Sequence, residues 1–184
     1  IAYPSNASDA KGLLKMACRM DDPVLFMEHK GLYRQGYAAT DEPDSDYIIP
    51  FGKGRLVSNG NYLTLVTWGA MVQKSVEAVQ ELLLEENIVE IIDLRTLNPI
   101  DFDILEVSIN KTGKVLIVHE DNLTNGPGAE ISAMISEKFF EYLDGPIKRV
   151  AAKDSPIPFN WVIEERILPQ TKDISNAIEE LLEY

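Results

Sequence analysis

Two short runs in this sequence place a histidine beside a glutamate, a pairing that acid–base chemistry often uses. Glu28 precedes His29, and His119 is followed by Glu120 and Asp121. Histidine titrates near neutral pH and a neighbouring carboxylate raises its pKa, so His29, His119 and Glu120 are the candidate catalytic residues. Both runs follow apolar segments typical of strands, and adjacent residues on a strand point to opposite faces. We therefore favour hydrogen-bonding, positioning or subunit-contact roles for them over catalysis.

Other kinds of reaction centre have weaker support. The turn at residues 125–128, Asn-Gly-Pro-Gly, could present backbone N–H groups to a phosphate at the start of a helix. Pro127 removes one of these donors, and the G-x-G-x-x-G and Walker spacings are absent, so a plain helix start is favoured. With two histidines and one cysteine, a zinc site built from His and Cys is not expected. No serine nucleophile elbow occurs either.

A charged turn, DLRTLNP, occupies residues 93–99 after another apolar run. We expect an Asp93–Arg95 contact that shapes this turn. The alternative is that Arg95 meets a carboxylate across a subunit interface, a role that its planar guanidinium favours. Arg95 is therefore a candidate partner-binding residue.

The elements that must position these residues alternate regularly after Gly60. Residues 115–118 form a continuous apolar run, which suits a strand that ends at His119 and is buried on both faces of a parallel sheet. Asp101 is a plausible helix cap. Strands separated by helices predict an α/β fold with three layers and a mainly parallel sheet. The other predicted strands are 62–68, 88–94 and 147–151, and the predicted helices are 71–86, 101–110, 129–143 and 173–183.

The first fifty residues follow a less regular pattern. Apolar residues at helical spacing predict a helix over 9–20, in which we expect Cys18 to be buried. Residues 23–27 are predicted to form a short buried strand. From residue 37 to residue 54 the periodicity disappears and Pro, Gly and acidic residues accumulate, as in a linker or an irregular crossover. We therefore place a domain boundary between residues 53 and 54.

Acidic residues dominate the charge of the chain. It has 30 Asp and Glu against 17 Lys and Arg, a formal net charge of −13. Nucleic acids and anionic membranes would repel such a protein, whereas a basic protein partner is compatible with it. No apolar run approaches the roughly 20 residues that span a bilayer, and the single cysteine favours a reducing cytoplasm. The sequence opens at Ile1 without a methionine, so we expect a fragment of a longer protein.

Several motifs in collinear order resemble one family. They are PSNASDAKGLLKMACRMDDPVLFMEHKGLYR, VTWGAMVQKSVEAVQELL, DLRTLNPID, VLIVHEDNLTNGPGAEI and RVAAKDSPIPF. Together they are similar to the C-terminal part of the β subunit of the thiamine-diphosphate-dependent decarboxylating component of 2-oxo acid dehydrogenase complexes, of the pyruvate or branched-chain type. The resemblance covers essentially the whole chain. Residues 34–40 are similar to versions in which the α and β portions are fused in one chain.

This resemblance implies a transketolase-like C-terminal domain over residues 54–184, preceded over residues 1–53 by the end of a pyrimidine-binding domain and a linker. It implies thiamine diphosphate and Mg²⁺ in the complete enzyme, bound by residues outside this sequence, so we expect the fragment alone to be inactive and free of cofactor. The implied partners are the α subunit or α portion, a second β portion in a dimer, and the dihydrolipoyl acyltransferase core. Asp154 and Tyr184 are the implied candidates for holding the basic subunit-binding domain of that core.

Two other functions stay open. The C-terminal domain of a transketolase or of a deoxyxylulose phosphate synthase shares the expected architecture. A stand-alone binding module with a flavodoxin-like sheet is the other alternative. The loop of residues 67–71 speaks against it, because this loop lacks the repeated Ser and Thr that hold a flavin phosphate.

Overall fold

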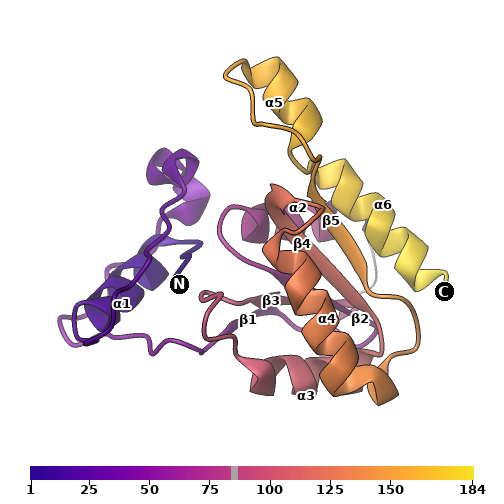
Figure 1. Ribbon diagram of the computed structural model, residues 1–184, viewed down its shortest axis with the longest axis horizontal. Helices are drawn as coiled ribbons and strands as arrows, with labels where there is room; N and C mark the ends of the chain where they lie inside the picture. The colour runs from indigo at the N-terminus through magenta and orange to yellow at the C-terminus, as the bar shows by residue number, and fades with distance from the viewer. Residues whose placement is uncertain (84–86) are drawn as a thin grey trace.

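The computed structural model describes residues 1–83 and 87–184, and its centre is a five-stranded sheet. The strand order is β1-β3-β2-β4-β5. Strands β3, β2, β4 and β5 run parallel to their neighbours, whereas β1 is antiparallel to β3. Helices cover both faces of the sheet (Figure 1), so the predicted three-layer α/β fold is confirmed. The strands are Arg55–Ser58 (β1), Leu63–Thr67 (β2), Val89–Asp93 (β3), Val115–Asn122 (β4) and Lys148–Ala152 (β5).

The central strands are buried on both faces, as their continuous apolar sequences predict. Every residue of β2 and β3 is buried, and so are the first five residues of β4. Successive side chains on a strand alternate between the two faces. Leu63 and Leu65 therefore join one hydrophobic core, and Val66 joins the other.

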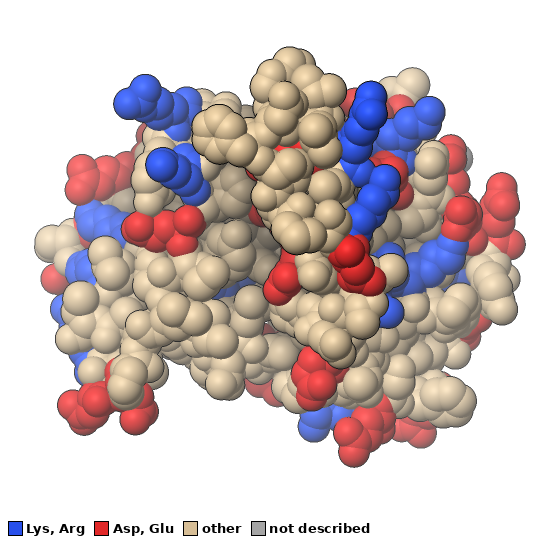
Figure 2. Space-filling view, turned by 45° about the horizontal axis from the view of Figure 1, so that its top comes forward, with Lys and Arg blue, Asp and Glu red and all other residues tan. Residues whose placement is uncertain are grey.

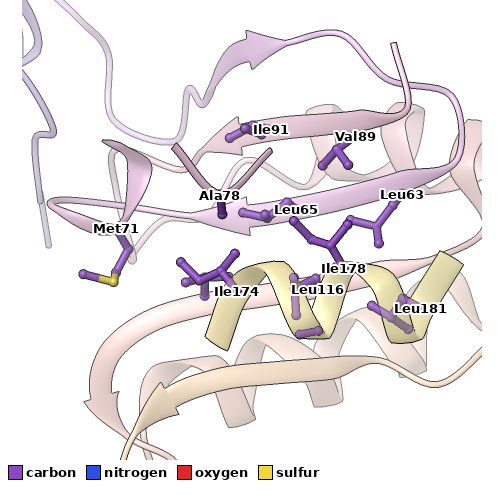
Figure 3. Packing of buried hydrophobic residues seen from close by; sticks show 12 residues of the cluster. Leu63, Leu65, Met71, Ala78, Val89, Ile91, Leu116, Ile174, Ile178 and Leu181 are labelled. Atoms are coloured by element: carbon purple, nitrogen blue, oxygen red, sulfur yellow. The ribbon is translucent and has the colours of Figure 1, made fainter. Parts of the chain in front are cut away.

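Two pairs of helices close these cores. On one face lie α2 (Met71–Glu81) and α6 (Thr171–Leu182). Figure 3 shows Ile174, Ile178 and Leu181 of α6 packed with residues of the central strands. On the other face, α3 (Phe102–Thr112) and α4 (Pro127–Phe139) pack against Val66 and its neighbours. A short 3-10 helix, η3 (Phe140–Tyr142), follows α4.

Most predicted helices occur, with shifted ends. The helix predicted over 71–86 begins at Met71 and ends at Glu81, and the predicted end at residue 86 lies outside the described residues. Asp101 caps α3, because its side chain accepts the Ile104 N–H at 3.4 Å. Within the described ranges, no helix is long and apolar enough to cross a membrane.

Two elements were not predicted. β1 is a short edge strand with partly exposed residues, so it lacks the apolar run that marks a central strand. α5 (Trp161–Ile167) lies between the strand predicted over 147–151 and the helix predicted over 173–183. Its start is capped by Asn160, whose side chain accepts the Val162 N–H at 3.0 Å, but no residue of α5 is buried. α5 therefore has no apolar stripe facing a core, which is the pattern that predicts a helix.

Two predictions for the first segment, residues 1–53, are wrong. Residues 23–27 do not form a strand: Phe26 makes an isolated bridge to Ala2, and Leu25 is 57% exposed. Cys18 is exposed, since α1 (Ala7–Ala17) ends one residue before it. An apolar run becomes a buried strand only where neighbouring strands and helices cover it, and 23–27 has Ala2 alone as its pairing partner among the described residues. The rest of this segment contains η1 (Lys30–Arg34) and η2 (Gly36–Ala38).

A substitution at Gly60 tests the close packing between the β1–β2 loop and β3. A Cβ atom at Gly60 would lie 2.0 Å from the Glu90 backbone nitrogen and 2.2 Å from the Val89 carbonyl carbon. We expect Gly60→Ala to lower the free energy of unfolding by about 3 kcal/mol, because backbone must move to admit the methyl group. Urea unfolding measures this change.

The matched control is Gly36→Ala, since no atom lies within 4 Å of a Cβ at Gly36. Its unfolding free energy should stay within about 0.5 kcal/mol of the wild type. Equal losses for the two substitutions would contradict the packing that we describe.

Candidate functional site at the carboxyl ends of the strands

The sheet has a topological switch point between β2 and β4. From β2 the chain passes through α2 to β3 on one side, and from β3 it crosses through α3 to β4 on the other side of β2. In open α/β sheets, ligands bind in the crevice that this divergence leaves at the carboxyl ends of the strands. Thr67 pairs with Val118 in this sheet, so Trp68 and His119 are the residues that emerge at the switch point.

Trp68 and His119 form a stacked pair of rings at this switch point. Their ring centroids are 5.4 Å apart and their planes differ by 8°. His119 is fully buried, and among the described residues neither of its ring nitrogens has a hydrogen-bond partner. Burial lowers the pKa of His119 to about 4, so the ring is neutral at physiological pH. No carboxylate of the described residues forms a hydrogen bond with this ring, as the partner in an acid–base pair would.

The glycines of the 125–128 turn allow this burial. A Cβ atom at Gly128 would lie 2.3 Å from Nε2 of His119, and one at Gly126 would lie 3.0 Å from its Cε1. Pro127 opens α4, as the helix-start interpretation predicts. The turn therefore makes room for a ring, a role that its sequence did not reveal.

Tyr3 of the first segment covers the same point from outside. A Cβ atom at Gly69, where φ is +57°, would lie 2.9 Å from the Tyr3 ring. The Tyr3 N–H donates to the Arg95 carbonyl at 2.8 Å. Burial, together with the charges of Glu120 and Asp121, raises the pKa of Tyr3 to about 12. Tyr3 and Trp68 line a cavity of about 590 Å³ that stays open beside them.

Asp93, at the end of β3, is the centre of a buried ionic cluster. Its Oδ2 accepts hydrogen bonds from Ser5 Oγ at 2.5 Å and from Arg55 Nη2 at 3.1 Å. Its Oδ1 accepts the backbone N–H of Arg95 at 3.0 Å. Burial raises the pKa of Asp93, and the hydrogen bonds from Ser5 and Arg55 oppose that rise.

Asp9 completes the cluster from α1. Its Oδ1 lies 2.6 Å from Nη2 of Arg95, and its Oδ2 lies 3.5 Å from Nε of Arg55. The expected Asp93–Arg95 contact is therefore made by the Arg95 backbone, while the Arg95 guanidinium pairs with Asp9. The carboxylate that meets Arg95 belongs to the same chain and comes from the first segment.

His29 and Glu120 form a second link between the first segment and the sheet. Nε2 of His29 lies 3.2 Å from Oε1 of Glu120, and this hydrogen bond raises the pKa of His29. The histidine of the first run is thus hydrogen-bonded to the glutamate of the second run. His119 and Glu120 do not interact with each other, because one is buried in the stack and the other faces His29.

Asp154 and Tyr184 lie at opposite ends of β5. Asp154 follows the strand and accepts the Thr124 N–H at 2.9 Å and the Thr124 hydroxyl at 2.6 Å, which lower its pKa. Tyr184 packs beside Gly145, which precedes the strand, and is 74% exposed. Five strand residues, about 16 Å, separate the two ends. They do not form one patch.

Residues 52–174 match the family model described as the C-terminal domain of transketolase. The chain belongs to this family. Over all of its 184 residues it is 41% identical to proteins named pyruvate dehydrogenase E1 component subunit beta, from Staphylococcus epidermidis and from Staphylococcus aureus. It spans 56% of the length of each of these relatives. The expected resemblance to such β subunits is therefore confirmed.

A solved structure shares the fold of this transketolase-family chain. It is described as a split gene transketolase, inactive beta4 tetramer, and it superposes with a TM-score of 0.77 at 24% sequence identity. The match covers 99% of this chain and 56% of the other. At this identity, the likeness establishes the fold.

The buried carboxylates do not fit a site for Mg²⁺ and a diphosphate. In the described ranges, Asp9, Glu90, Asp93 and Asp101 each lie within 4.0 Å of a Lys or Arg nitrogen. Mg²⁺ needs oxygen ligands free to surround it, and no group of three or more His, Cys, Asp or Glu in these ranges could hold a metal. Thiamine diphosphate and Mg²⁺ would need ligands from elsewhere in a complete enzyme.

Asp9→Asn tests the ionic cluster, because it keeps the shape of the side chain and removes the charge that faces Arg95. We expect the free energy of unfolding to fall by about 3 kcal/mol, since a buried guanidinium loses its counter-charge. Glu42→Gln is the control. Glu42 pairs with Lys11 at the surface and is 86% exposed in its side chain, so its substitution should leave the free energy of unfolding nearly unchanged. Urea unfolding near pH 7 compares them, and similar losses would refute the cluster's role.

His119→Phe tests the burial of a neutral ring. The unfolded chain binds the His119 proton near pH 6.5 and the folded chain near pH 4, so His119 makes stability fall as pH drops through this window. Between pH 7 and pH 4, the wild type should lose up to about 3 kcal/mol relative to His119→Phe, which cannot titrate.

His29→Gln provides the matched comparison with the opposite sign. Because Glu120 raises the pKa of His29, its contribution is present below the unfolded pKa and is lost as pH rises through the folded value. Denaturant unfolding at a series of pH values measures both variants. A difference from wild type that does not change with pH for His119→Phe would contradict the assignment.

Proposed function

We propose that this chain is the C-terminal assembly region of the β subunit, or of the β portion of a fused αβ chain, in a pyruvate dehydrogenase E1 component. The complete enzyme would decarboxylate a 2-oxo acid oxidatively and pass the acyl group to lipoamide. Identity of 41% over the whole chain to subunits with that name supports this proposal. The same names favour pyruvate over branched 2-oxo acids as the substrate. The proposed location is the cytoplasm, which the single cysteine favours.

The packing at the switch point is the observation on which the assembly role rests. Tyr3, Trp68 and His119 take up part of the place where a fold of this type would hold a small ligand. The cavity of about 590 Å³ beside them is lined by Glu120, Asp121 and Glu164, whose carboxylates would repel a diphosphate. Thiamine diphosphate with Mg²⁺ would supply the decarboxylation chemistry in the complete enzyme. The residues of this chain would form a rigid surface against which other subunits dock.

α5 and the loop before it support a role in assembly. Three large apolar side chains are exposed here: Phe159 is fully exposed, Trp161 is 67% exposed and Ile163 is 49% exposed. We call this region, residues 159–163, the apolar projection, and Figure 2 shows a largely uncharged projection at the top of the molecule. Large exposed apolar side chains in one contiguous patch mark interaction surfaces. The proposed partners are the α subunit or α portion, a second β portion in a dimer, and the dihydrolipoyl acyltransferase core.

The acyltransferase core is proposed to contact Asp154 and Tyr184 through its basic subunit-binding domain, and Arg95 is the candidate for a contact across a subunit interface. Tyr184 is exposed. Asp154 is exposed but already accepts two hydrogen bonds from Thr124. Arg95 is paired with Asp9. Of the three, Tyr184 is therefore the residue with the fewest contacts to give up on binding.

Activity of the complete native protein with its partner subunits tests the proposed reaction. Supplied with thiamine diphosphate and Mg²⁺, it should decarboxylate pyruvate faster than branched 2-oxo acids in a lipoamide-linked or dye-linked assay. Turnover of sugar phosphates instead would assign the chain to a transketolase or a deoxyxylulose phosphate synthase. A bound flavin would favour the stand-alone module.

Asp154→Ala tests the docking proposal separately. Binding of the basic subunit-binding domain, measured by calorimetry, should weaken about threefold, because one exposed charge pair is lost. Added salt should weaken wild-type binding as well, since exposed pairs are screened. Asp21→Ala removes an equally exposed carboxylate from the first segment and should leave the affinity unchanged. Affinity that responds neither to Asp154→Ala nor to salt would refute the assignment.

A further inference from the structure

A basic groove runs beside the outer edge of the sheet. Its volume is about 490 Å³, and it lies between the end of β5 and the segment that joins α5 to α6. Its carboxylates are Glu165 and Asp173, and Asp173 already accepts the Gln170 N–H at 2.9 Å. Its cationic lining residues are Arg149, Lys153, Arg166 and Lys172.

These cations are concentrated on a chain whose net charge is −13. Lys153, Arg166 and Lys172 are exposed, and none of them lies within 4.0 Å of a carboxylate oxygen of the described residues. Figure 2 shows a row of Lys and Arg side chains along one flank of the apolar projection. Cations gathered in a groove attract an anionic group more strongly than the same cations spread over a surface.

The groove also borders unpaired main chain. The Ala152 carbonyl accepts the Leu123 N–H at 2.9 Å, so it faces β4. Peptide groups alternate in direction along a strand, and therefore the N–H and C=O of Arg149 and Ala151 face away from β4. Because β5 is the last strand of the described sheet, these groups have no strand partner there. At Lys153 the outward N–H donates to the Ile167 carbonyl at 3.1 Å, which closes this end of the edge.

We propose that this groove binds an extended acidic peptide segment of a partner protein, which adds a strand to the free edge of β5 while its carboxylates meet the basic side chains. Main-chain hydrogen bonds give such a complex its affinity, and alternate side chains give it specificity. Val150, Ala151 and Leu168 supply an apolar part of the lining for alternate residues of the segment.

The charges disfavour a second copy of this chain as the occupant. Two β5 edges placed together would bring Arg149 and Lys153 of one copy close to the same residues of the other. Lys on an edge strand prevents this kind of pairing. An acidic segment instead converts the same residues into attractive contacts.

This surface goes beyond the proposed function, because its partner has the opposite charge to the basic domain proposed for Asp154 and Tyr184. The two proposals fail independently. Loss of one binding reaction predicts nothing about the other.

Fluorescence anisotropy with a labelled peptide that alternates Glu and Val tests the electrostatic part. The same peptide with Gln in place of Glu should bind at least about tenfold more weakly. The double variant Arg166→Glu, Lys172→Glu should weaken binding of the Glu peptide about tenfold. Lys30→Glu with Arg34→Glu makes the same charge change on the exposed η1 and should alter it less than about twofold. Equal effects of the two double variants would overturn the proposal.

Two N-methylated peptides test the added strand. One carries N-methyl groups on its Glu amides and the other on its Val amides. Only one of these sets can face β5 in an extended peptide, so one peptide should lose binding and the other should keep it. Binding of both, or inorganic phosphate displacing the peptide as strongly as free peptide does, would show that no strand is added and would overturn the proposal.

Discussion

Two buried carboxylates and two partly exposed guanidinium groups, from four separate parts of the chain, meet at the carboxyl end of β3. Asp9 comes from α1, Arg55 from β1, Asp93 from β3 and Arg95 from the following turn. A buried charge is costly unless an opposite charge and hydrogen bonds compensate it. Each of these groups therefore depends on the others, and the first segment is held in place on the sheet by this requirement.

The switch point shows how this placement changes the chemistry of the fold. With the first segment docked, Tyr3 lies over Gly69, and His119 is sealed behind Trp68 and the glycines of the next turn. Burial keeps the imidazole neutral and the phenol protonated. Groups that look reactive in the sequence are thus used for packing. His29 and Glu120 interact across the junction and give it a second, more exposed attachment.

Some of this arrangement could be predicted from the sequence. The strands 62–68, 88–94 and 115–119 were found because burial on both faces demands an apolar residue at every position. β1 and α5 were missed, since neither buries a continuous apolar pattern. Residues 23–27 have such a pattern without the neighbours that make it a strand.

At the site, adjacency along the chain suggested Asp93 as the partner of Arg95 and Glu120 as the partner of His119. The structure pairs Arg95 with Asp9 and Glu120 with His29, which are 86 and 91 positions away. A left-handed backbone at Arg95, with φ of +59°, accompanies this arrangement. Local patterns name the groups that need partners, but only the topology decides which groups meet.

The ionic cluster also redefines the smallest unit that can be expressed and folded. A piece cut at the boundary between residues 53 and 54 would retain Arg55, Asp93 and Arg95 but lose Asp9 and Ser5. Two partly buried arginines would then share one carboxylate. A piece that keeps Ser5 and all four charged groups begins no later than Ser5. We therefore expect α1 to fold and unfold together with the sheet as one cooperative unit.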